Sequence, residues 1–126
     1  MKRLFFTMLC ALAFVACSEK TAEEKIAEKV ATYYTTMLKG DFEACVNTFE
    51  ASDRVDLLNE PVAREVFESQ EYRDYVKICE GFEIVSIDIR DDFAGVEVGF
   101  TNGEGEYLLL VNVDNDWFVT AGNPQD

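Results

Sequence analysis

The chain of 126 residues contains no histidine. Sites that activate a serine or cysteine through an imidazole therefore cannot form, and neither can a histidine metal triad or the two-histidine helix of zinc peptidases. Basic residues are also few, with 11 Lys and Arg against 25 Asp and Glu. A surface of this charge repels phosphate backbones, so we expect no nucleic-acid partner.

A long hydrophobic run is absent as well. The apolar stretch over residues 4–16 is broken only by Thr7 and stops short of the roughly 20 residues that a membrane-spanning helix needs. Lys2 and Arg3 precede the stretch, and the polar segment Ser18-Glu19-Lys20 follows it. A positive start, a short apolar core and small residues before a polar segment are typical of a cleaved export signal.

The end of this stretch, Leu12-Ala13-Phe14-Val15-Ala16-Cys17, resembles a bacterial lipoprotein signal, although Phe14 departs from the smaller aliphatic residue that is commoner there. The resemblance implies a signal peptide over residues 1–16, lipidation of Cys17, and a short tether over residues 17–20. Ordinary cleavage that leaves a free thiol at Cys17 is the alternative. Ser18 is not the aspartate that marks inner-membrane retention in some bacteria, which favours the outer membrane and leaves the membrane side open.

Residues 21–126 are expected to form a single domain. The two basic residues Lys2 and Arg3 precede Cys17 and no acidic residue does, so the remainder has nine basic and 25 acidic residues and a formal net charge of −16. Because 48% of the chain is hydrophobic and ten residues are Phe, we expect a packed domain rather than an acidic disordered tail.

The first part of this domain has a helical period. Thr21 and Glu24 are spaced as a capping box, an apolar stripe follows, and Lys39-Gly40 is a typical helix end. Asp41 is placed to cap a second, shorter helix. Residues 52–59 are expected to form a turn or a single loose helical turn.

A third helix is predicted from Pro61 to Cys79, because proline suits the first turn of a helix. Its apolar stripe loses phase near Ser69 and Gln70, where we expect a bend or a break. The prediction is therefore three helices in the N-terminal part of the domain.

After Gly81 the period changes to alternation, which predicts four strands joined by short polar turns. Helices followed by strands indicate an α+β fold, and short turns favour a consecutive antiparallel meander. Tyr107 to Val113 is apolar on both faces, so something is expected to cover its far side. A loop, the first helix or a second subunit could do so, and we favour a homodimer.

Three stretches carry a further resemblance: Leu38-Lys39-Gly40-Asp41-Phe42-Glu43, Ala94-Gly95-Val96-Glu97-Val98, and Asp114-Asn115-Asp116-Trp117-Phe118-Val119. In order and spacing they resemble small bacterial lipoproteins of unknown function with a lumazine-binding-like, or nuclear transport factor 2-like, fold. The resemblance implies a curved sheet wrapped around a long helix, forming a cone that is a binding pocket, an active site or a filled core. The residues expected to line the cone are Tyr33, Tyr34, Phe100 and Trp117.

Cys45 and Cys79 are the cysteines left for the fold, and an exported location permits a disulfide between them. Two buried free thiols are the alternative. Neither cysteine has a neighbour suited to zinc, and Asp114-Asn115-Asp116 lacks the glycine and distant glutamate of a calcium loop, so we expect no metal and no cofactor.

The function that we expect is a noncatalytic, lipid-anchored module that binds a small apolar molecule or an envelope protein. The alternative is an isomerase-like or dehydratase-like enzyme with a carboxylate and a tyrosine inside the cone. Its candidates by residue type are Asp88, Glu97, Tyr33, Tyr34 and Tyr107. Because Asp88 and Glu97 alternate with apolar neighbours, both are expected to face solvent, and no catalytic residue is assigned.

Overall fold

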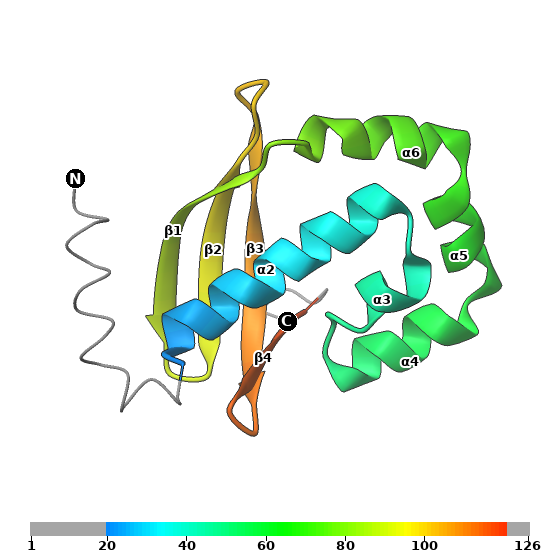
Figure 1. Ribbon diagram of the computed structural model, residues 1–126. Helices are drawn as coiled ribbons and strands as arrows, with labels where there is room; N and C mark the ends of the chain where they lie inside the picture. Colours follow the sequence, from blue (N-terminus) through cyan, green and yellow to red (C-terminus); the bar gives the residue numbers. More distant parts are fainter. Residues whose placement is uncertain (1–19, 121–126) are drawn as a thin grey trace.

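The computed structural model describes residues 20–120 of the chain, so the signal segment and Cys17 lie outside the described residues. In the described part, helices come first and an antiparallel four-stranded sheet follows, which confirms the predicted α+β class. Figure 1 shows the long helix α2 (Ala22–Lys39) crossing one face of the sheet. Shorter helices are grouped around its C-terminal end: α3 (Phe42–Val46), α4 (Ala51–Asn59), α5 (Pro61–Glu68) and α6 (Gln70–Val76).

Helix α2 has the predicted ends. The Thr21 hydroxyl accepts a hydrogen bond from the backbone N–H of Glu24, and the Glu24 carboxylate accepts one from the N–H of Thr21. At the other end Gly40 has a φ of 79°, a left-handed conformation that glycine adopts without steric cost. The buried residues of α2 are all apolar or aromatic: Ile26, Val30, Tyr34 and Met37.

The prediction of three helices is wrong, because the described residues contain five α-helices and the short 3-10 helix η1 (Lys77–Cys79). The segment expected to be a turn forms α4, a full helix of nine residues. None of its residues is buried, and Leu57 is the apolar side chain of this helix that is partly buried against the core, so the helix lacks a continuous buried face. The Glu50 carboxylate caps it by accepting hydrogen bonds from the N–H groups of Ser52 and Asp53.

The predicted third helix is divided into α5 and α6 at Ser69, as the change of phase indicated. The Ser69 hydroxyl donates a hydrogen bond to the Val66 carbonyl and accepts one from the N–H of Tyr72. One side chain therefore ends the first helix and begins the second, and the two helices can turn different faces to the core.

The sheet has the strand order β1-β2-β3-β4, and each neighbouring pair is antiparallel. Positive φ values at Asp91, Asp114 and Asn115 belong to the tight turns between strands, as the polar breaks in the sequence suggested. The strands are β1 (Glu83–Arg90), β2 (Phe93–Gly99), β3 (Gly105–Val113) and β4 (Asp116–Val119).

Strand β1 differs from the expected alternation. The register shifts between Ile84 and Ser86, so that Val85 is extruded and 60% exposed rather than facing the helix with Ile87. A bulge adds one residue to one strand and reverses the facing of the residues before it. Simple alternation could not locate this extra residue.

The middle of the space between α2 and the sheet is filled by side chains, and an open groove of about 510 Å³ remains between the start of α2 and β1. Val96 and Val98 of β2 and Leu110 of β3 are fully buried against Ile26, Val30 and Tyr34 of α2 in one hydrophobic cluster. The other face of the sheet keeps Phe93 and Tyr107 exposed, and the Tyr107 ring lies over Gly95, where any Cβ atom would collide with its hydroxyl. Glycine permits this close approach, and a larger residue at position 95 would displace the exposed Tyr107 ring.

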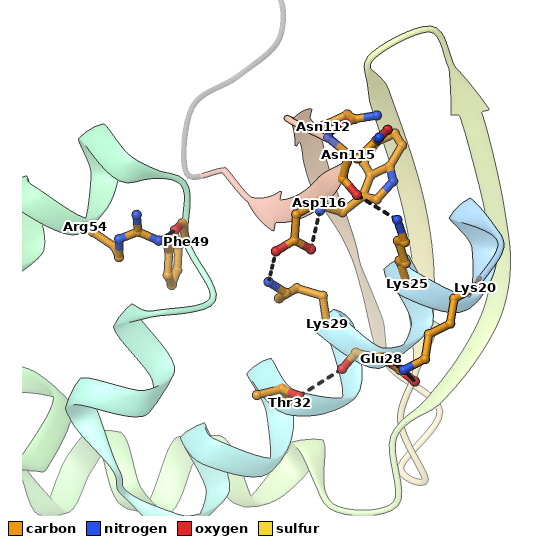
Figure 2. Close-up of polar contacts among 11 residues, drawn as sticks. Lys20, Lys25, Glu28, Lys29, Thr32, Phe49, Arg54, Asn112, Asn115 and Asp116 are labelled. Atoms are coloured by element: carbon orange, nitrogen blue, oxygen red, sulfur yellow. Dashed lines mark hydrogen bonds and ion pairs between the residues drawn. The ribbon is translucent and has the colours of Figure 1, made fainter. Parts of the chain in front are cut away.

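Two further connections hold the helices to the sheet. In Figure 2, Lys25 donates a hydrogen bond to the Asn115 carbonyl at 2.8 Å, and Lys29 lies 3.8 Å from the Asp116 carboxylate. At the other edge of β4, the segment between α3 and α4 pairs with Val119 through backbone hydrogen bonds at Thr48 and Glu50. These contacts orient α3 and α4 relative to the C-terminal half of α2.

Candidate functional site

An apolar pocket of about 410 Å³ lies among the helices, away from the filled space between α2 and the sheet. Five of its lining residues are aromatic: Tyr33, Phe42, Phe49, Phe67 and Tyr72. The others are the aliphatic side chains of Val46, Leu57, Val62, Ala63 and Val66, together with Glu60. The volume lies within the range of roughly 300–1,000 Å³ that is usual for small-molecule sites.

Each helix supplies one part of the wall. Phe42 and Val46 come from the buried face of α3, and Phe67 ends the buried face of α5. Val62 and Val66, one turn apart on α5, are 55% and 49% exposed. The pocket is therefore closed by rings on the core side and bordered by exposed aliphatic groups on the solvent side.

The aromatic walls are held in place by arginines that do not line the pocket. The Arg64 guanidinium lies 4.8 Å from the Phe42 ring centroid and forms ion pairs with Glu43 and Glu68. The Arg73 guanidinium lies 4.7 Å from the Phe67 centroid.

Arg73 also connects α6 to the end of α2. It donates hydrogen bonds to the Met37 carbonyl at 2.9 Å and to the Phe67 carbonyl at 3.1 Å. A cation is favourable at this position because the last carbonyls of a helix carry partial negative charge. Its Nη2 atom is buried and has no hydrogen-bond partner among the described residues.

Three polar groups reach the pocket wall. The Tyr72 hydroxyl donates to the Met37 sulfur at 3.4 Å, and burial raises the pKa of Tyr72 to about 12. Burial also raises the pKa of Tyr33, whose hydroxyl makes no hydrogen bond to any described residue. Glu60 stands between α4 and α5 and makes no side-chain cap to α5. The pocket thus offers two neutral hydroxyls and one carboxylate.

Of the residues predicted to line a cone, Tyr33 alone belongs to this pocket. Tyr34 has no exposed surface and stacks on Phe82, with ring centroids 4.9 Å apart. Phe100 contacts the edge of Tyr34, and Trp117 is 2% exposed. Tyr34 and Trp117 are therefore core residues, and Phe100 is partly buried against the same core.

A carboxylate and a tyrosine do meet inside the fold, although the carboxylate is not one that the sequence suggested. The Tyr34 hydroxyl donates a hydrogen bond to Glu106 of β3. Burial, reinforced by this hydrogen bond, raises the pKa of Tyr34. Glu106 shares a strand face with the buried Leu108 and Leu110, and this alternation was the available signal for its position.

The other candidate acids face solvent, as predicted. Asp88 accepts a hydrogen bond from Arg90, and Glu97 accepts one from Ser86. Both carboxylates are exposed on the outer face of the sheet, where Tyr107 is also 66% exposed. The structure does not bring these three residues into the pocket.

Cys45 and Cys79 are both free and buried in the structure. Burial raises the pKa of Cys45 and raises that of Cys79 to about 11, so each is a protonated thiol at neutral pH. The Cys45 thiol contacts the Tyr33 carbonyl at 3.9 Å.

Residues 20–120 contain no group of three or more Cys, Asp or Glu side chains arranged to hold a metal ion. None of the helices in this part of the chain is both long and apolar enough to span a membrane.

No family model matches the chain, and no curated protein matches it. Among solved structures, the chain is similar to a Campylobacter jejuni protein described provisionally as an NTF2-like transpeptidase. The identity is 19%, the alignment covers 76% of this chain and 98% of the other, and the TM-score is 0.46. At these values the similarity transfers neither an activity nor a fold to this chain.

Proposed function

We propose that the protein is a lipid-anchored lipoprotein of the cell envelope whose domain is a noncatalytic binding module for a small apolar ligand. The anchor is inferred from the signal-like residues 1–16 and from Cys17. Several acyl chains on one cysteine would hold the domain at the membrane, because each buried methylene contributes about 0.8 kcal/mol. We place it at the outer membrane because Ser18 is not the aspartate that marks inner-membrane retention in some bacteria.

The observation that supports ligand binding is the pocket itself. Its wall is formed by ten apolar or aromatic side chains and Glu60, and two of the aliphatic groups remain largely exposed without a ligand. Exposed aliphatic surface beside a concave aromatic wall gains free energy when an apolar molecule covers it, at about 25 cal/mol per Å².

The nuclear transport factor 2-like fold remains part of the proposal. The resemblance implied a sheet wrapped around one long helix, and the observation in its favour is that α2 crosses one face of the four-stranded sheet (Figure 1). A homodimer also stays a prediction, and the exposed Phe93 and Tyr107 on the outer sheet face are the surface through which two copies would pair.

The enzymatic alternative has one observation in its favour, the hydrogen bond from Tyr34 to Glu106. A catalytic acid or base must reach its substrate. Tyr34 is completely buried, and neither residue lines the apolar pocket. We therefore infer that this pair is structural, and that ligand binding does not depend on it.

Filling the pocket tests the proposal. Ala63 lines it from α5, so Ala63→Trp should occupy space that a ligand needs. With detergent-free Cys17→Ser protein as background, we expect the affinity for the uncharged dye N-phenyl-1-naphthylamine to fall about tenfold, which equals the loss of roughly 55 Å² of buried apolar ligand surface. Fluorescence titration measures the affinity.

Ala51→Trp is the matched control, because Ala51 is an exposed alanine at the start of α4 that does not line the pocket. It should bind the dye as the background protein does. Equal dye affinity in the Ala63 and Ala51 variants, with both still folded by circular dichroism, would contradict the proposed site.

A further inference from the structure

We propose that the natural ligand of the apolar pocket carries a positive charge and that Glu60 recognises this charge, an inference that rests on the proposed function. Glu60 is the one acidic side chain among the residues that line the pocket, which include no basic one. It ends α4 and precedes α5, at the border between the aromatic wall and solvent. A ligand whose apolar part fills the pocket would place a polar group close to this carboxylate.

The Glu60 carboxylate is not used by the protein. It makes no hydrogen bond to the N-terminus of α5, and no hydrogen bond or ion pair joins it to another described residue. Glu50 at the start of α4 provides the contrast, since its carboxylate accepts two backbone hydrogen bonds. An acidic group that borders an apolar pocket and has no internal partner is available to a ligand cation.

The cations near the pocket do not cancel this preference. Arg64 is shared between Glu43 and Glu68, so two acids surround one base there. Arg73 stacks on Phe67 and Tyr72 but is not among the residues that line the pocket, and its one unpartnered nitrogen is buried. An anion in the pocket would therefore lie beside Glu60, whereas neither arginine is part of the pocket lining.

The pocket rings and the overall charge act in the same direction. Tyr33 and Phe49 meet edge to face with centroids 5.8 Å apart, and faces of such rings attract cations. The formal net charge of −14 attracts cations to the protein and repels anions such as fatty acids. The chemical class that fits is an amphiphilic amine or quaternary ammonium compound.

Three probes with the same alkyl chain and different head groups test the inference. Decylamine, decanol and decanoate are titrated, below their micelle-forming concentrations, against the uncharged dye bound to Cys17→Ser protein. Decylamine should displace the dye at about fivefold lower concentration than decanol, the effect of one ion pair in a mostly solvated setting. Decanoate should be the weakest competitor.

Glu60→Gln should remove the difference between decylamine and decanol while dye binding persists. Glu65→Gln removes the same charge from an exposed position on α5 that does not line the pocket, and it should preserve the difference. Equal competition by decylamine and decanol in the starting protein, or a preference for decylamine that survives Glu60→Gln, overturns the inference and leaves the proposed function intact. Failure of the starting protein to bind the dye overturns both.

Discussion

Two adjacent tyrosines of α2 show how position on a helix decides the environment of a side chain. Consecutive residues of an α-helix point about 100° apart, so Tyr34 faces the sheet while Tyr33 lines the pocket. Tyr34 is tied to Glu106 by a hydrogen bond, whereas the Tyr33 hydroxyl has no such partner among the described residues. The two hydroxyls should therefore contribute differently to stability.

At neutral pH, Tyr33→Phe should change the free energy of unfolding by less than about 0.5 kcal/mol, because no hydrogen bond is lost. Tyr34→Phe should cost about 1–3 kcal/mol, since it leaves the Glu106 carboxylate without its donor in a partly buried site. Urea denaturation measures both values. Equal losses in the two variants would show that the hydrogen bond to Glu106 does not stabilise the fold.

Alkaline pH gives an independent test at the same residue. Burial raises the pKa of Tyr33 above its ordinary value of 10.0, so above that pH the unfolded chain loses the proton while the folded chain keeps it. Stability from this group is complete below pH 10 and falls as the pH rises, by about 1.4 kcal/mol per pH unit for one proton. Tyr33→Phe removes this proton, so the free energy of unfolding should fall less steeply with pH, by about 1.4 kcal/mol per pH unit. An unchanged slope would contradict burial of this hydroxyl.

Among the helices, α2 and α4 are opposites. Helix α2 combines a capping box, a left-handed glycine end and a buried face, whereas α4 has nine residues, no buried residue and a glutamate cap. Isolated helices shorter than roughly 12 residues are marginal in water, so α4 must be stabilised by its contacts with the rest of the protein. Because none of its residues is buried, these contacts are few. Leu57 is its contribution to the pocket wall.

Hydrogen exchange should reveal this difference. Backbone amides of α4 are expected to exchange through local opening, well before those of the buried face of α2, because local stability follows burial. Saturating dye should slow exchange in α4 and α5, since a ligand adds contacts to Leu57 and Val62. Mass spectrometry of peptides from the two helices measures both effects, and uniform protection of all helices would contradict them.

In the proposed lipoprotein, the anchor and the pocket are separate parts of the molecule. A tether of residues 17–20 would span at most about 14 Å when extended, so lipidation of Cys17 would keep the start of α2 close to the membrane. The pocket lies among the helices grouped at the other end of α2, as Figure 1 shows for α3 to α6. An anchored domain of this shape could meet a ligand near the membrane without inserting into it.

Metabolic labelling tests the anchor. Labelled palmitate should be incorporated into the natural protein and should be absent from Cys17→Ser, because the acyl chains require this sulfur and the amino group that cleavage frees. Cys45→Ser is a matched control, since it removes a buried thiol inside the domain. Label that persists in Cys17→Ser would refute the lipoprotein assignment.

Much of the fold was predictable because local signals are strong where elements have caps and one buried face. The Thr21–Glu24 box, Gly40, the phase change at Ser69 and the alternation of Ala94, Val96 and Val98 all correspond to the observed structure. Helix α4 and the bulge at Val85 were missed, because a helix without a buried residue lacks a continuous core-facing stripe and a bulge reverses alternation without a distinctive residue.

By itself the sequence determined the class of the fold, both ends of α2, the break at Ser69 and the strand face shared by Ala94, Val96 and Val98, since all of these depend on neighbours a few positions away. The tertiary structure alone decided that Tyr34 is buried in the core while Tyr33 lines the pocket, and that Tyr34 is hydrogen-bonded to Glu106. It also decided that Glu60 lines the same pocket as five aromatic side chains. The physical reason is that a pocket is the space left when separate helices pack. Its existence depends on how α3, α5 and α6 are oriented around α2, which no periodicity within one segment records.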